Sequence, residues 1–171
     1  LAAAKEQCLY MLESGPAAGV TGASVVCRQH GITRAISFDM GGTTAKAAVI
    51  EDGASRMAAD YFVGGYVQGL PLRIPVVDIH EVGMGGGSIA RVDGSGMLTV
   101  GPDSAGAEPG PISYGLGGTD PTVTDANVVL GRIDPQNFLG GRVALDAAAA
   151  AAAIDARIAR PLGIALEEAA S

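Results

Sequence analysis

The hydrophobic positions in the first hundred residues fall in short runs separated by glycine and polar residues, a pattern typical of β-strands. Strands are expected at residues 8–13, 34–40, 43–50, 57–63, 74–82, 89–92 and 97–100. Asp52-Gly53 and residues 93–96 (DGSG) have the composition of tight turns, so each predicts a hairpin between the strands that it joins. The first half of the chain is therefore expected to consist largely of antiparallel strands.

Helices are expected around and after these strands, at residues 14–30, 122–130 and 146–160. Gly31 is placed to end the first helix. Asp146 is placed to cap the last one, whose alanine run favours helix, and Pro161 and Gly163 are placed to end it. Residues 101–121 hold much glycine and proline and are expected to form a long loop. Strands with flanking helices indicate a mixed α/β protein.

Composition narrows the class of protein. With 171 residues, 48% of them hydrophobic and 17% charged, the chain has the make-up of a globular domain with its own core. The net charge of −7 argues against a nucleic-acid partner, and no apolar run reaches the ~18–20 residues of a membrane helix. Cys8 and Cys27 are expected to be buried thiols in a reducing cytoplasm. Leu1 and a helix that only begins at residues 167–171 indicate a piece of a larger protein.

The glycine-rich segments suggest phosphate binding, and three known devices compete for that interpretation. A Walker loop needs GxxxxGK followed by Ser or Thr, whereas Lys46 follows no glycine directly and precedes Ala47. A dinucleotide fingerprint needs GxGxxG at the start of a helix, whereas residues 83–88 (GMGGGS) run straight into the strand at 89–92. Both are disfavoured, which leaves a β-hairpin that clamps phosphate.

Residues 38–46, read FDMGGTTAK, have the order of such a clamp. Two glycines allow backbone N–H groups to face a phosphate without a Cβ in the way, and two threonines add hydroxyl donors. Asp39, near the end of the first strand of the hairpin, is suited to holding a hydrated magnesium ion. The expected phosphate ligands are Gly41, Gly42, Thr43, Thr44 and, as added positive charge, Lys46. The alternative is an ordinary tight hairpin with a capping aspartate.

Asp78, His80 and Glu81 form a second group of candidates. Asp78 and His80 are expected on one face of a strand and Glu81 on the other. One histidine with one carboxylate is an incomplete ligand set for zinc. Three interpretations stay open for the group: a metal site, a substrate pocket lined by His80, or ordinary structural polar residues.

Downstream positions add candidates that line a substrate or cleft. These are Gly85, Gly86, Gly87, Ser88, Asp125 and Asn127. The glycine run either brings backbone close to a reacting ligand or forms a simple tight turn. Asp125 and Asn127 either contact substrate or magnesium, or Asp125 caps the short helix together with Thr124.

Segments along the whole chain resemble the hydantoinase A/5-oxoprolinase family, in the order in which that family has them. The similar segments are residues 13–23 (ESGPAAGVTGA), 38–46 (FDMGGTTAK), 78–93 (DIHEVGMGGGSIARVD), 100–115 (VGPDSAGAEPGPISYG), 121–132 (PTVTDANVVLGR) and the closing stretch from LDAAAA to LEEAA. The resemblance implies an α/β fold that is part of an actin/Hsp70/sugar-kinase-like (ribonuclease H-like) ATPase, with residues 1–171 as one wall of its nucleotide cleft.

The family's chemistry implies a function. Its members use ATP and Mg²⁺ to hydrolyse cyclic amides of the hydantoin or 5-oxoproline type by phosphorylating the carbonyl oxygen, and relatives are subunits of ATP-dependent ketone carboxylases. The resemblance also implies a B-type partner subunit or domain, with the loop at residues 101–121 as a candidate contact. A non-enzymatic, nucleotide-switched scaffold of the actin type is the alternative from another class.

Two positions depart from the family pattern, and two motifs are missing. Lys46 and Ser113 stand where many relatives carry Asp and Cys, so neither a second acidic ligand nor a thiol role is expected. The family's earlier DxGGT-type motif and its later GGxGP-type segment lie outside these 171 residues. We therefore expect the isolated chain to bind ATP weakly and to be inactive alone.

Overall fold

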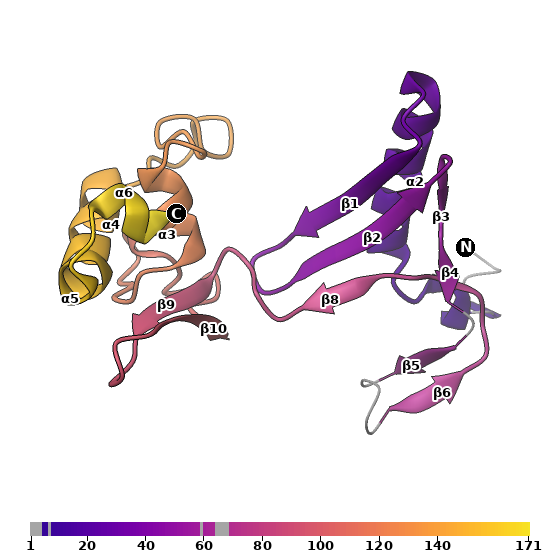
Figure 1. Ribbon diagram of the computed structural model, residues 1–171, viewed down its shortest axis with the longest axis horizontal. Coiled ribbons are helices and arrows are strands. Elements are labelled where there is room, and N and C mark those ends of the chain that lie inside the picture. The colour runs from indigo at the N-terminus through magenta and orange to yellow at the C-terminus, as the bar shows by residue number, and fades with distance from the viewer. Residues whose placement is uncertain (1–4, 7, 59, 64–68) are drawn as a thin grey trace. The chain divides into compact units, whose positions relative to one another are not determined.

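Figure 1 shows the computed structural model of the chain, which describes residues 5–6, 8–58, 60–63 and 69–171. The chain divides into two compact units. The first comprises residues 1–39 and 46–81, and the second comprises residues 40–45 and 82–171. No helix among the described residues is long and apolar enough to cross a membrane.

The first unit is organised around one helix, α2 (Ser14–His30), which has the predicted bounds. Gly31 ends it in the left-handed conformation (φ 65°), and the Ile32 N–H returns to the Cys27 carbonyl at 2.9 Å. Glu13 occupies the N-cap position without making a side-chain cap bond. Its carboxylate instead accepts a hydrogen bond from the Tyr61 hydroxyl at 3.1 Å.

A sheet packs against this helix (Figure 1). Its strands β1 (Arg34–Met40), β2 (Ala45–Glu51) and β3 (Ala54–Ser55) lie in sequence order, and β8 (His80–Val82) also pairs with β2. The turn predicted at Asp52-Gly53 joins β2 to β3, with both residues at positive φ. Cys27 of α2 packs with Ala48 and Ile50 of β2, and complete burial of a side chain such as Ile50 contributes roughly 1.5–3 kcal/mol.

Three predictions for the first unit are wrong. Residues 8–13 contain a 3₁₀ helix, η1 (Cys8–Met11), in place of a strand, and Cys8 is exposed, whereas Cys27 is buried as expected. The two expected long strands are shorter pieces: β4 (Met57–Ala58) and β5 (Tyr61–Val63) lie within 57–63, and β7 (Val76–Val77) and β8 lie within 74–82, whereas β6 (Leu70–Leu72) lies outside both. Residue 59, within the expected strand 57–63, lies outside the described residues. Because proline has no N–H for a ladder, β7 begins only after Pro75 and pairs with β4.

The second unit begins with the predicted hairpin of β9 (Ser88–Val92) and β10 (Leu98–Ser104). Asp93 holds its turn: the carboxylate accepts from the Ser95 hydroxyl at 2.6 Å and from the Met97 N–H at 3.0 Å. These bonds, the Ser95 hydroxyl first, lower the pKa of Asp93. β10 continues to Ser104, beyond the predicted end at residue 100 and into the segment expected to be loop.

Short helices complete the second unit (Figure 1). They are η2 (Ile112–Tyr114), α3 (Val123–Val129), α4 (Ala147–Ile154), the π-helical turn η3 (Asp155–Ala159), α5 (Arg160–Leu162) and α6 (Leu166–Ala170). Asp146 caps α4 as predicted, accepting from the Ala149 N–H at 2.9 Å, and Gly163 ends α5. Pro161 does not end the helix, because it lies within α5, near its start. Ile154 and Ile158 form the centre of the core of this unit.

Candidate functional site

The turn between β1 and β2 has the geometry of an anion-binding loop. Within it, the Gly41 N–H donates to the Thr44 carbonyl at 2.9 Å. The carbonyls of Gly41 and Gly42 face inward and accept hydrogen bonds from two other backbone amides. In the described part of the chain, the N–H groups of Gly42 and Thr43 have no hydrogen-bond partner, and Thr43 is exposed. The turn therefore has free donors at its tip, which suits an anion such as phosphate.

Asp39 comes one residue before the end of β1 and is exposed. Its carboxylate makes no hydrogen bond or ion pair with another described residue. A single exposed carboxylate suits Mg²⁺, which keeps several waters and takes its remaining ligands from phosphate oxygens. The donor set therefore fits the magnesium role expected of Asp39.

The glycine run packs against the carbonyl side of the turn. The Gly86 N–H donates to the Gly41 carbonyl at 2.9 Å, and the Gly87 N–H donates to the Gly42 carbonyl at 2.7 Å. Gly85, Gly87 and Ser88 are buried. The run does bring its backbone close to another segment, and that segment is the turn at 41–44, a neighbour that neither of the two interpretations named.

Asp125 is a structural residue in this arrangement. It is 0% exposed, and its carboxylate accepts from the N–H groups of Ile112 (3.1 Å), Ser113 (2.8 Å) and Thr122 (3.0 Å) and from the Thr122 hydroxyl (2.9 Å). The expected helix α3 is present, but Thr122, and not Thr124, is its N-cap, with Asp125 as the partner in a capping box. The four bonds occupy the carboxylate that was a candidate for substrate or magnesium.

Asn127 is engaged at the other end of α3. Its side-chain oxygen accepts from Arg132 at 3.3 Å, and its backbone carbonyl accepts from the Arg132 N–H at 2.9 Å. These contacts fix the chain where it leaves the helix. The structure therefore gives Asn127 a local structural role.

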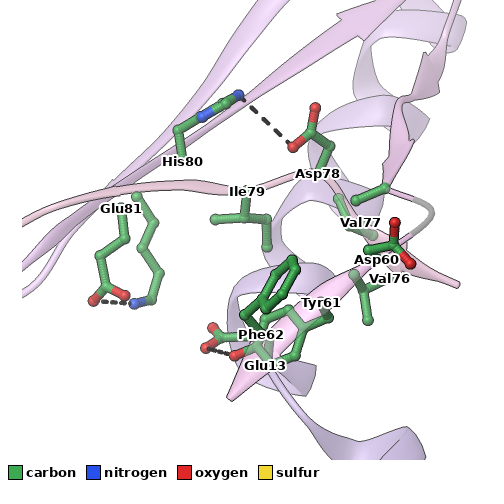
Figure 2. Close-up of a pocket in the computed structure, with 12 residues that line it drawn as sticks. Glu13, Asp60, Tyr61, Phe62, Val76, Val77, Asp78, Ile79, His80 and Glu81 are labelled. Carbon is green, nitrogen blue, oxygen red and sulfur yellow. Dashed lines mark hydrogen bonds and ion pairs between the residues drawn. The ribbon is translucent and has the colours of Figure 1, made fainter. Parts of the chain in front are cut away.

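A cavity of about 560 Å³ lies in the first unit (Figure 2). Its apolar wall is formed by Ala58, Phe62, Val76, Val77 and Ile79. Its polar lining comprises Glu13, Asp60, Tyr61, Asp78, Glu81, His80 and Lys46. The volume is within the range of small-molecule sites, and four carboxylates against one lysine make the lining acidic.

Lys46 belongs to this cavity. Its ammonium contacts the Glu81 carboxylate at 2.6 Å, and this hydrogen bond is the main cause that raises the pKa of Lys46. Lys46 was expected to add positive charge to the phosphate clamp. In the structure most of that charge is offset by Glu81.

His80 and Asp78 lie on one side of their segment and Glu81 on the other, as the strand periodicity predicts (Figure 2). His80 Nε2 is 3.7 Å from Asp78 Oδ1, and the His80 side chain is 72% exposed. Across the described ranges, no group of three or more His, Cys, Asp and Glu side chains is placed to hold a metal ion. The position of His80 on the cavity wall fits best the substrate-pocket interpretation.

Sequence reasoning missed three polar residues of the cavity, Glu13, Asp60 and Tyr61. Tyr61 donates to Glu13 although the two are 48 positions apart. Burial is the main cause that raises the pKa of Tyr61, with the Glu13 hydrogen bond second. No local pattern marks such a pair, although Glu13 begins one of the segments that carry the family resemblance.

Comparison with solved structures defines the class of protein. The chain superimposes on the ATP-dependent caprolactamase of Pseudomonas jessenii with a TM-score of 0.76 and 43% identity, covering 92% of this chain and 22% of that one. The mixed α/β, actin-like ATPase class expected from the sequence is thereby confirmed.

Sequence comparison then gives the family. The model described as hydantoinase/oxoprolinase matches residues 1–171, and the chain belongs to this family. It is 42% identical over 166 residues to caprolactamase subunit alpha of P. jessenii, covering 97% of the chain and 23% of the relative. It is 44% identical over 158 residues to the acetophenone carboxylase gamma subunit of Aromatoleum aromaticum, covering 92% of the chain and 21% of the relative. The chain thus spans less than a quarter of the length of these relatives.

Proposed function

We propose that this chain forms one phosphate-binding wall of the nucleotide site in an ATP-dependent enzyme that hydrolyses cyclic amides of the hydantoin or 5-oxoproline type. The observation that carries the proposal is the turn at 41–44. Its carbonyls at Gly41 and Gly42 accept hydrogen bonds from the glycine run, while the N–H groups of Gly42 and Thr43 are free among the described residues. Membership of the hydantoinase/oxoprolinase family supports it, as does the likeness to an ATP-dependent caprolactamase.

Asp39 and the turn at 41–44 have separate roles at the phosphates. ATP, when bound, supplies the phosphoryl group that converts an unreactive amide oxygen into a good leaving group. The N–H groups of Gly42 and Thr43 donate to phosphate oxygens, with the hydroxyls of Thr43 and Thr44 beside them. Asp39 holds magnesium through water. Catalysis by such a site is mainly positioning and neutralisation of charge.

The cavity of the first unit is our candidate for the substrate. Its apolar wall, which includes Phe62 and Ile79, suits the carbon skeleton of a small ring, and His80 and Tyr61 offer polar contacts. Because Lys46, the lysine of the described lining, is already paired with Glu81, it adds little attraction for an anionic substrate beside four carboxylates. We therefore assign Lys46 to the cavity and expect a neutral ring to enter it most readily.

A second candidate function is that of a subunit of an ATP-dependent ketone carboxylase. The 44% identity to an acetophenone carboxylase subunit favours it. Both candidates place the chain in a complex, because both relatives are named as subunits, and we propose a B-type subunit or domain as its partner.

The test is ATP consumption by the full-length protein with its partner, screened against hydantoins, lactams, 5-oxoproline and, with bicarbonate, ketones. We expect turnover with a cyclic amide, and loss of that turnover on Asp39→Asn with the protein still folded. Asp134→Asn, at an exposed aspartate elsewhere in the chain, is the matched control. Ketone-dependent turnover would select the carboxylase. Absence of turnover with every compound, despite nucleotide binding, would overturn both and favour a nucleotide-switched scaffold.

A further inference from the structure

The backbone packing behind the phosphate turn is unusually close at Gly85. A Cβ placed on this residue would lie 2.6 Å from the Gly42 carbonyl carbon and 2.6 Å from both the N and the carbonyl carbon of Thr43. These are backbone atoms, which cannot rotate away as a side chain would. Gly85 does not have a positive φ, so space alone requires glycine at this position.

The next two glycines are also confined, although their shortest contacts are to side-chain hydroxyls. A Cβ on Gly86 would lie 2.8 Å from the Thr124 hydroxyl oxygen, and one on Gly87 would lie 2.7 Å from the Ser104 hydroxyl oxygen and 3.0 Å from the Gly42 carbonyl oxygen. The amides of both glycines donate to the turn carbonyls. Contact and hydrogen bonding therefore act together on the peptide group between Gly42 and Thr43.

The glycine run is itself held rigidly in the second unit. The Gly86 carbonyl accepts from the Thr124 N–H at 2.8 Å, and the Gly87 carbonyl accepts from the Ala105 N–H at 2.8 Å. The Gly85 N–H donates to the Ser88 hydroxyl at 2.9 Å, and Ser88 is 1% exposed. The run thus connects the turn to the start of α3 and to the segment after β10.

We propose that Gly85, Gly86, Gly87 and Ser88 are positioning residues that set the conformation of the phosphate turn from behind and do not contact substrate. The N–H groups of Gly86 and Gly87 bind the carbonyls of Gly41 and Gly42 and so orient two peptide groups. The N–H ends of these peptide groups, at Gly42 and Thr43, face the ligand. A shift of the turn by a few tenths of an ångström would misplace these donors, because hydrogen bonds weaken steeply with poor geometry. The proposal rests on the proposed function for the identity of the ligand, but not for the packing.

The test compares Gly85→Ala with Gly83→Ala in the full-length protein. Gly83 is exposed, and a Cβ placed on it would meet nothing within 4 Å, so it is a matched control in the same loop. We expect Gly85→Ala to raise both the Kd for ATP and the KM for ATP at least tenfold, and Gly83→Ala to change them less than twofold. Equal affinities for ATP in the two variants would overturn the proposal.

A second readout does not depend on nucleotide. Amide hydrogen exchange of Gly86 and Gly87 in the free protein should rise at least tenfold in Gly85→Ala and stay unchanged in Gly83→Ala. Ser88→Ala removes the acceptor of the Gly85 N–H without adding volume, and serves if Gly85→Ala does not fold. We expect the same loss from it in milder form, a few-fold weaker ATP binding with faster exchange at Gly86. Unchanged exchange and affinity in Ser88→Ala would contradict the positioning role.

Failure of this proposal differs from failure of the proposed function. If Thr43→Pro, which removes a free N–H donor together with the hydroxyl, leaves ATP affinity unchanged in a folded protein that binds ATP, the turn is not the phosphate site, and the proposed function fails. If amide exchange at Gly86 and Gly87 still rises in Gly85→Ala, the claim that the glycine run sets the conformation of the turn stands. If Thr43→Pro weakens ATP binding but Gly85→Ala does not, the positioning role alone fails.

Discussion

Replacing Asp125 by alanine should destabilise the second unit without any direct effect on substrate. The carboxylate is fully buried and accepts four hydrogen bonds, three of them from backbone N–H groups. Each hydrogen bond to a charged acceptor contributes about 1.5–3 kcal/mol, but the four share one group and are not additive. Asp125→Ala leaves buried N–H donors without a partner, which costs about 1–3 kcal/mol for each donor, and we expect a total loss of about 3–5 kcal/mol.

The loss is best measured by amide hydrogen exchange of Ser113 and Thr122 in the full-length protein. Because about 1.4 kcal/mol corresponds to a tenfold change, protection at these amides should fall about a hundredfold or more. Asp134→Ala is the control, since Asp134 is exposed and its carboxylate accepts a hydrogen bond from the Gln136 N–H at 2.9 Å, and it should change protection less than tenfold. Unchanged protection at Ser113 and Thr122, together with lost ATP turnover, would refute the structural assignment and make Asp125 a ligand.

Three further predictions follow from side chains in the two units. Ser113→Ala should leave the melting temperature unchanged or raise it, because the buried Ser113 hydroxyl has no hydrogen-bond partner among the described residues; a loss above about 1 kcal/mol would contradict this. Lys46→Met should cost less than about 1 kcal/mol of unfolding free energy. That difference should stay constant from pH 7 to 9 and vanish only as pH rises above the ordinary Lys46 pKa of 10.5, because pairing with Glu81 raises it; a difference that disappears by pH 9 would exclude the pair. In the substrate assay, neutral lactams and hydantoins should show a lower KM than 5-oxoproline, and Glu13→Gln should narrow that gap; a lower KM for 5-oxoproline in the wild type would argue against the acidic cavity as the substrate site.

Signals confined to a few neighbouring residues predicted the fold well. Gly31 ends α2 and Asp146 caps α4 because a positive-φ position and an N-cap act within one turn of helix. The cap of α3 was assigned two residues too late, although Thr122 and Asp125 have the spacing of a capping box. The local sequence therefore held enough information to locate the cap of α3, although the cap was assigned to the wrong residue.

Such local signals do not identify the partner of a strand when no tight turn joins the two. The apolar run at residues 8–13 has the composition of a strand, but none of the described strands pairs with it, and Leu9, Tyr10 and Met11 are 49–65% exposed on a 3₁₀ helix. The expected strand at 57–63 is divided because β4 pairs with β7 while β5 pairs with β6. A two-residue alternation gives the face of each side chain but does not give the strand that lies alongside.

The same limit explains what the sequence could and could not say about the candidate site. The GGTT turn was recognisable because its chemistry lies within four consecutive residues. The glycine run at 85–87 was interpreted either as a place where backbone comes close to a ligand or as a simple tight turn, because glycine has no side chain that could indicate its neighbour. The structure identifies a neighbour that neither interpretation named, more than forty positions away in the sequence: a Cβ placed on Gly85 would lie 2.6 Å from backbone atoms of Thr43. A ligand in that place would have to displace backbone atoms that two hydrogen bonds hold, and so the run is better placed to shape the phosphate turn than to touch what binds there.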